Sequence, residues 1–141
     1  LFNQEGKMIG LVSQAANGNR THVISYSISD IKKELEYMSN GKGVPYMGIW
    51  GVVLPDELKK EGLEKGIVVH EIDADSPAMK AGIQCGDVIT HISDTAISDM
   101  KEYRNTLLKL NEKNEVVLTG QRKGADDSYV EMNFKVVIGK K

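Results

Sequence analysis

Alternation of apolar and polar residues marks the start of the chain. Residues Lys7–Val12 and His22–Ile28 alternate with a period of two, which predicts two strands. The Asn-Gly-Asn sequence at 17–19 lies between them and predicts a turn. Because two or three strands form no stable sheet by themselves, we expect residues 1–29 to pack on the rest of the chain, to pair with a neighbouring copy, or to be loosely ordered.

The period then changes from two to that of a helix. A helix is predicted over residues 31–38, where apolar side chains recur on one face behind an N-cap at Ser29 or Asp30. The Asn-Gly-Lys-Gly sequence that follows ends the helix and is typical of a short linker. We therefore expect two domains, residues 1–40 and residues 44–141.

The second domain alternates between strands and mostly short helices, each bounded by capping or turn residues. Ser76 followed by proline predicts a helix start, and Asp99 with Glu102 predicts a capping box. The predicted elements are a strand at Ile49–Leu54, a short helix within Pro55–Gly62, a strand at Gly66–Ile72, a helical turn from Pro77 to Gly82, a strand from Gly86-Asp87-Val88-Ile89, a helix at Met100–Leu110, and strands at Glu115–Gln121 and Tyr129–Ile138. This order predicts a mainly β, α+β fold: a small, partly open barrel capped by helices.

Composition narrows the class without naming a function. The chain has 141 residues, 40% hydrophobic and 27% charged, as in ordinary soluble globular proteins. A formal net charge of -2 gives no reason to expect nucleic acid as a partner. One cysteine forms no internal disulfide, and we find no signal peptide or membrane-length apolar run. Because the chain opens on Leu1-Phe2 without an initiator Met, we expect a piece of a longer protein.

Metal and cofactor chemistry finds no support in the residue spacing. The three histidines and Cys85 sit at no metal-ligand spacing. Asp73 and Asp75 have the D-x-D spacing of a calcium loop, but the required glycine and distal glutamate do not follow. We therefore predict no cofactor and no metal, and interpret these two aspartates as turn and capping residues.

One apolar loop, Pro45-Tyr46-Met47-Gly48-Ile49-Trp50-Gly51, passes straight into a predicted strand. Gly48 allows consecutive N–H groups to point one way, and such a nest suits an anion. A terminal carboxylate of a peptide is one such anion, and the strand that follows can pair with the peptide backbone. The alternative is a buried hairpin without a ligand.

Several motifs of the second half resemble a PDZ domain of the bacterial HtrA/Deg type. They are the aromatic-apolar-Gly-apolar loop, the strand that begins Gly66-Ile67-Val68, the Ser-Pro-Ala and Ala-Gly sequences within 76–83, and Gly86-Asp87-Val88-Ile89. Upstream, Leu1-Phe2-Asn3, Gly6–Gly10 and Ser29–Lys33 resemble the end of the trypsin-like domain that precedes the PDZ domain in that family. The resemblance implies a circularly permuted PDZ fold behind a protease remnant.

The resemblance also implies a peptide groove. The amides of Met47, Gly48 and Ile49 would bind the terminal carboxylate, and Met47 and Ile49 would line the pocket for the last side chain. Trp50 would lie on the opposite face or on the rim. The full set of candidate peptide-binding residues is Tyr46, Met47, Gly48, Ile49, Trp50 and Gly51 from the loop and strand, with Met100, Tyr103, Arg104 and Leu107 from the facing helix. For Tyr103 and Leu107 a purely structural place in the core is the alternative.

A trypsin-like protease needs a serine, a histidine and a carboxylate, and in the resembled family the nucleophile precedes the Leu-Phe-Asn match. The chain would therefore lack the catalytic triad, and Ser13, Ser25 and Ser27 are interpreted as strand or turn serines. The family ends this domain with a Gly-Phe-Ala-Ile-Pro-type strand, where this chain has Ile24–Ser29.

The expected function is capture of apolar C-termini or extended segments of misfolded proteins for an HtrA-type endopeptidase. The alternative is an adaptor or scaffold whose parent protease domain is degenerate. The resemblance further implies an extracytoplasmic bacterial setting and a trimeric parent. For this fragment we expect a monomer or a weak dimer, with peptides as partners and neither nucleic acid nor metal.

Overall fold

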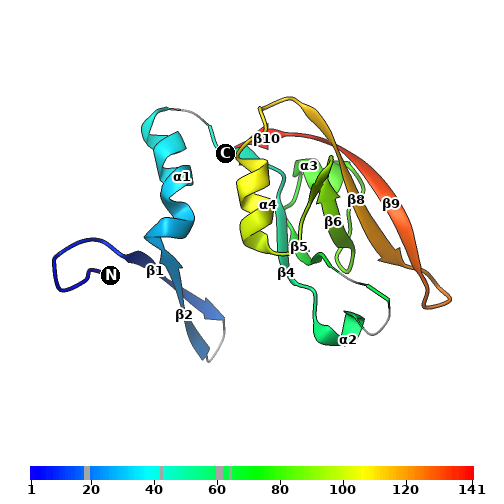
Figure 1. Cartoon of the computed structure of the whole chain (residues 1–141), viewed down its shortest axis with the longest axis horizontal. Helices are drawn as coiled ribbons and strands as arrows, with labels where there is room; N and C mark the ends of the chain where they lie inside the picture. The colour runs from blue at the N-terminus through cyan, green and yellow to red at the C-terminus, as the bar shows by residue number, and fades with distance from the viewer. Residues whose placement is uncertain (18–19, 42, 60–61, 64) are drawn as a thin grey trace. The chain divides into compact units, whose positions relative to one another are not determined.

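The computed structural model describes residues 1–17, 20–41, 43–59, 62–63 and 65–141. By their internal contacts these residues form two compact units, Leu1–Gly43 and Val44–Lys141. Figure 1 colours the chain from its first residue to its last, and the two units are described separately below.

The first unit is a hairpin followed by a helix. Strands β1 (Gly10–Asn17) and β2 (Arg20–Ser27) pair antiparallel, from Gly10 opposite Ser27 to Asn17 opposite Arg20. Helix α1 spans Ile28–Ser39. The predicted strand at Lys7–Val12 starts too early, because the Asn3 side chain accepts hydrogen bonds from the N–H groups of Glu5 and Lys7 and holds this stretch in a turn. Two residues of the predicted turn, 18 and 19, lie outside the described residues.

The N-cap prediction for α1 is wrong by two residues or more. Ser27, not Ser29 or Asp30, is the N-cap: its backbone is extended and its hydroxyl accepts a hydrogen bond from the N–H of Ser29 at 3.2 Å. Serine is a favoured N-cap wherever it meets the first turn, so a run of Ser and Asp offers competing starts. Ser27 is therefore both the last residue of β2 and the N-cap of α1.

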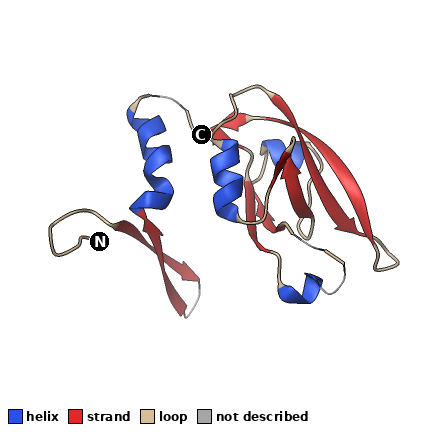
Figure 2. Ribbon diagram, viewed as in Figure 1, coloured by secondary structure: helices blue, strands red, loops and turns tan. Residues whose placement is uncertain are grey.

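The second unit is built on one antiparallel sheet, in the order β4-β5-β6-β8-β9. These strands are Ile49–Val53, Ile67–Ile72, Val88–Ile92, Glu115–Lys123 and Tyr129–Val137, and the two-residue strand β7 (Thr95–Ala96) pairs with β6. The mainly β class with a few helices is confirmed. The sheet stays open, so β4 is left as an edge strand (Figure 2).

A second, two-stranded sheet joins the two ends of this unit. β3 (Pro45–Tyr46) pairs antiparallel with β10 (Gly139–Lys140). Beside them, Val44 and Lys141 exchange both backbone hydrogen bonds at 3.1 Å. The sequence prediction missed this pair, since neither segment is long enough to show a period.

The described residues of this unit contain three helices, α2 (Asp56–Lys59), α3 (Pro77–Lys80) and α4 (Met100–Leu107). Of these, α3 and α4 are shorter than predicted. The Ser76 cap of α3 is confirmed, and so is Asp99, whose carboxylate accepts from the N–H of Glu102 at 2.7 Å. α4 ends before Leu110 because the N–H groups of Lys109 and Leu110, just past the helix, bond to carbonyls three residues back, as in a tight turn. Part of the predicted α2 segment, residues 60 and 61, lies outside the described residues.

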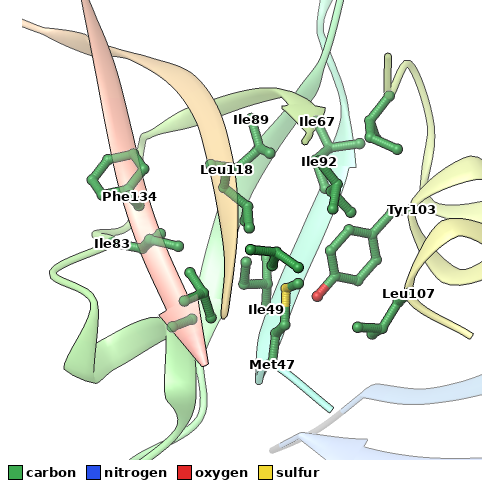
Figure 3. Close-up of a cluster of buried hydrophobic side chains, with 14 of the residues drawn as sticks. Met47, Ile49, Ile67, Ile83, Ile89, Ile92, Tyr103, Leu107, Leu118 and Phe134 are labelled. Carbon is green, nitrogen blue, oxygen red and sulfur yellow. The ribbon is translucent and has the colours of Figure 1, made fainter. Parts of the chain in front are cut away.

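The core lies between the sheet, α3 and α4. Alternate residues of β8 and β9 face it: Val116 and Leu118 on one strand, Phe134 and Val136 on the other. Figure 3 shows these strands contributing side chains to one cluster with Ile67 and Ile92. This core fixes the loop before β4, because Met47 is wholly buried in it.

A buried ion pair ties the Gly86-Asp87 turn to β8. The Asp87 side chain is 1% exposed, and Arg122 donates to both its oxygens, from Nε at 2.7 Å and from a terminal nitrogen at 2.8 Å. The N–H of Gln84 also donates to this carboxylate at 2.8 Å, and Arg122 reaches the carbonyl of Gly82 at 2.9 Å. Both carboxylate oxygens of Asp87 thus accept hydrogen bonds within the fold, which indicates a structural role for this residue.

Candidate functional site

The loop between β3 and β4 is held from behind by its carbonyl groups. The carbonyl of Met47 accepts from the N–H of Ala78, and that of Gly48 from the N–H of Asp73, both at 2.9 Å. Gly48 has φ +83°, and an added Cβ would overlap the Cβ of Ser76. Only glycine therefore fits this position without strain.

The N–H groups of the same loop are less used by the backbone than its carbonyl groups. Among the described residues, the N–H groups of Met47 and Gly48 take part in no backbone hydrogen bond. Since Asp73 donates to Gly48, the next pair of the ladder, Ile49 with Ile72, is of the non-hydrogen-bonded kind. The N–H of Ile49 therefore faces the open edge of β4. That the N–H groups of Met47, Gly48 and Ile49 together form a nest for a carboxylate stays a prediction.

Asp73 anchors the side chains on both sides of Gly48. Its carboxylate accepts hydrogen bonds from the Tyr46 hydroxyl and, at 2.7 Å, from Nε1 of Trp50. Lys141 Nζ lies 3.2 Å from the same carboxylate and 4.5 Å from the centroid of the Tyr46 ring. With its backbone bond to Gly48, Asp73 fixes the loop at three points (Tyr46, Gly48 and Trp50).

The electrostatics of this cluster follow from its hydrogen bonds. The Tyr46 and Trp50 donors, with Lys141, hold the pKa of Asp73 below its usual range. Burial together with the neighbouring Asp73 raises the pKa of Tyr46 to about 12. At neutral pH the carboxylate is ionised and the phenol keeps the proton that it donates.

Sequence reasoning missed the role of Asp73, which it treated as a turn residue. The side chains that it joins lie 27, 23 and 68 positions away along the chain. No local pattern reports such partners. The one available signal is that an aspartate placed just after a buried strand can reach the loop paired with that strand's end.

The predicted apolar wall is packed shut in this structure. Met47, Ile49, Tyr103 and Leu107 are buried in one cluster, and Figure 3 shows the Tyr103 ring of α4 beside Met47 and Leu107. Burial raises the pKa of the Tyr103 hydroxyl. That these four side chains line a peptide pocket stays a prediction, and it requires α4 and β4 to separate.

Of the remaining predicted residues, Gly48 is buried and the others are accessible. Trp50 is 52% exposed, and Tyr46, Gly51, Met100 and Arg104 are partly exposed. A Cβ at Gly51 would lie 3.0 Å from the carbonyl oxygen of Val68 on β5 and 3.4 Å from Sδ of Met100 on α4, so this position lies close to both elements. The structure thus brings the predicted loop, strand and helix together on one edge of the sheet.

The described residues were also compared with the requirements of a metal site and of a membrane-spanning helix. Across the described ranges, no group of three or more His, Cys, Asp or Glu side chains could hold a metal ion. Within the same ranges no helix has the length and apolarity to cross a membrane.

Changing Asp73 to Asn should weaken the loop anchor in a pH-dependent way. Because the pKa of Asp73 is lower in the folded chain, its ionised form stabilises the fold above the unfolded pKa of about 4, and this contribution disappears as the pH falls through the folded pKa. We expect a loss of about 1–2 kcal/mol in the free energy of unfolding at pH 7. Urea unfolding at pH 7 and at about pH 2.5 measures it.

The control for this variant is Asp75→Asn, which removes the same charge from an exposed residue two positions away. It should leave the free energy of unfolding nearly unchanged at both pH values. A loss in Asp73→Asn that is equally large at low pH would contradict the assignment to the ionised carboxylate.

Comparison with known proteins identifies a family in the part of the chain that holds the candidate site. The family model described as "PDZ domain" matches residues 45–132. A serine protease Do-like HtrA of Lactococcus lactis subsp. cremoris is 30% identical over 88% of this chain and 35% of its own length. A probable periplasmic serine endoprotease DegP-like of Pseudomonas fluorescens is 38% identical over 55% of this chain and 16% of its own length. The chain spans about a third of the first of these relatives, and less of the second.

Solved structures show the same fold. The HtrA-type protease AlgW with a decapeptide matches 96% of this chain and 43% of its own, with a TM-score of 0.62 and 21% identity. The HtrA3 PDZ domain bound to a phage-derived ligand, FGRWV, matches 67% of this chain and 84% of its own, with a TM-score of 0.54 and 24% identity.

Proposed function

This chain belongs to the PDZ domain family, in the form found in HtrA-type proteases, and we propose on that basis that its second unit binds peptide C-termini along β4. The observation that carries the proposal is that the N–H groups of Met47 and Gly48 have no backbone partner beside the free edge of the sheet. With the outward N–H of Ile49 they would form a row of donors. Such a row is a built-in anion site, and an edge strand accepts an added strand.

Binding would proceed by strand addition. The terminal carboxylate accepts hydrogen bonds from the three loop amides, and the peptide backbone pairs antiparallel with the outward groups of Ile49 and Gly51. The last side chain enters between β4 and α4, where it replaces contacts that Met47, Ile49, Tyr103 and Leu107 now make with one another. An apolar terminal residue suits that place, since it would be surrounded by apolar groups.

The relatives support a peptide as the ligand. AlgW was solved with a decapeptide, and the HtrA3 domain with a ligand whose sequence ends in valine. In the whole protein we propose that capture of exposed C-termini or extended segments delivers substrate to a serine endopeptidase, or shifts it between inactive and active states. The catalytic triad would belong to another part of that protein, and residues 1–40 would be the end of its trypsin-like domain.

The names of the relatives found by sequence support a cellular location. Because several of these relatives are described as periplasmic, we propose an extracytoplasmic location for the whole protein. We further propose that the whole protein assembles as a trimer through its protease domain, and that the present fragment is a monomer or a weak dimer. Sedimentation of the fragment at several concentrations measures the second point.

Peptides ending in a free apolar carboxylate should bind, and their amidated twins should bind about 10- to 100-fold more weakly. The reason is that hydrogen bonds to a charged group contribute about 1.5–3 kcal/mol. Isothermal calorimetry measures the affinity, and the fluorescence of Trp50, the one tryptophan, reports binding beside the loop. Equal binding of acids and amides would mean recognition of internal segments, and no binding at all would overturn the proposal.

A further inference from the structure

Trp50 stands on the face of the sheet that lies opposite the terminal-residue pocket. Ile49 points into the core, so by the alternation of a strand its neighbour Trp50 points outward, and its side chain is 52% exposed. The same alternation applies to a peptide strand added to β4. If the last peptide side chain enters between β4 and α4, the penultimate one lies on the outer face beside Trp50.

Glu71 continues this row on the next strand. It is the cross-strand partner of Trp50 in the β4–β5 register and is exposed. Neighbouring strands lie about 4.8 Å apart, so an added peptide, Trp50 and Glu71 would occupy three successive strands of one sheet. A short penultimate side chain would touch the indole alone, whereas a long one could cross the indole toward the carboxylate.

The chemistry of this row favours a cation. The indole ring is the strongest cation–π partner among the aromatic side chains. Asp73 accepts the indole N–H at 2.7 Å, which fixes the ring and leaves its face free. Asp73 shares its own charge with Lys141, while Glu71 forms no ion pair with any other described residue. The carboxylate that a peptide cation would meet is therefore that of Glu71.

From this arrangement we propose that Trp50, held by Asp73, and Glu71 form a subsite for a lysine or arginine at the penultimate position of the bound C-terminus. The inference rests on the proposed function, since it needs a peptide strand along β4. It adds a selection for basic side chains next to the apolar terminal residue. Asp73 is the positioning residue of this subsite, and Trp50 and Glu71 are its contact residues.

The test uses the whole chain and a set of free-acid peptides that differ only in the penultimate residue: lysine, methionine, tryptophan or glutamate before a terminal valine. The lysine peptide should bind about three- to tenfold more tightly than the methionine peptide, and the glutamate peptide more weakly than both. The preference for lysine should decrease at high salt, because an exposed pair is screened.

Two variants separate the contributions. Glu71→Gln should lower the affinity for the lysine peptide by more than the affinity for the methionine peptide, and so remove part of the lysine preference. The matched control is Glu131→Gln on β9, an exposed glutamate away from β4, which should change nothing. Trp50→Leu, followed by calorimetry because it lacks the fluorophore, should remove the rest of the preference.

The outcomes distinguish the two proposals. If the four acids bind equally, or if tryptophan is preferred without any effect of Glu71→Gln, the basic subsite is overturned and peptide binding stands. If none of the acids binds, the proposed function fails, and the subsite fails with it.

Discussion

Replacing Asp87 by Ala should lower the free energy of unfolding of the second unit by about 3–5 kcal/mol. The substitution removes the buried carboxylate and leaves the Arg122 guanidinium, whose side chain is 28% exposed, with the carbonyl of Gly82 as its remaining hydrogen-bond partner. It also strips a bond from the N–H of Gln84. Denaturant unfolding followed by circular dichroism measures the loss, with the second unit's transition expected at a much lower midpoint.

The control is Asp127→Asn, which removes the charge and keeps a side chain suited to the left-handed backbone of this residue, φ 63°. Asp127 also forms an ion pair, with Lys123 at 3.2 Å, but its side chain is 89% exposed, so the loss should stay below about 1 kcal/mol. The double change Asp87→Leu with Arg122→Met should recover part of the stability, because no unpaired charge remains buried. A double variant less stable than Asp87→Ala would show that the bonds themselves, and not the uncompensated charge, carry the effect.

Gly48→Ala should both destabilise the second unit and abolish binding of free-acid peptides. The new Cβ would overlap Ser76 and lie 2.9 Å from the Tyr46 hydroxyl, in a backbone conformation with φ +83°. We expect about 1–2 kcal/mol from the left-handed backbone and a further 1–3 kcal/mol, roughly, from the overlap. Any relief of the overlap would rotate the peptide groups of the loop. If the N–H groups of Met47, Gly48 and Ile49 bind the carboxylate, as we propose, that binding should be lost.

Gly82→Ala is a matched control for the backbone term. Gly82 has nearly the same conformation, φ +81°, and an added Cβ there meets nothing within 4 Å. It should show the backbone cost alone and leave peptide binding intact. Thermal unfolding gives the stability of both variants, and calorimetry with the same peptide gives the affinity. Equal losses of stability in the two variants would contradict a steric role for Ser76.

The sequence predicted the helices and strands whose positions depend on interactions between residues close together in the chain. Ser76 with Pro77 and Asp99 with Glu102 mark their helix starts because capping is decided within four residues. The antiparallel strands of the second unit followed from alternation and β-branched residues. The start of α1 was wrong because Ser27 and Ser29 both satisfy the same rule, and only the extended backbone at Ser27 selects between them.

The candidate site was predictable as a loop and not as a network. Gly48 and its apolar neighbours mark the loop, because a left-handed backbone favours glycine locally. That this loop is a nest for a carboxylate stays a prediction. The Asp73 anchor depends on how β4 and β5 pair, and the burial of Tyr103 depends on how α4 packs on that sheet. Both are tertiary facts, which a pattern along the chain does not contain.

The pairing of Val44 with Lys141 means that a force applied to these two residues acts first on the backbone next to the proposed binding loop. The two ends lie side by side at the same end of the antiparallel β3–β10 pair, so tension applied between them would open that pair like a zipper, one bond at a time. The first bonds to yield are those of Val44 and Lys141, and the next reach Tyr46, one residue before the loop. Force on the two ends would thus loosen the contacts among Lys141, Asp73 and Tyr46 before it acts on the strands β4-β5-β6-β8-β9 of the main sheet.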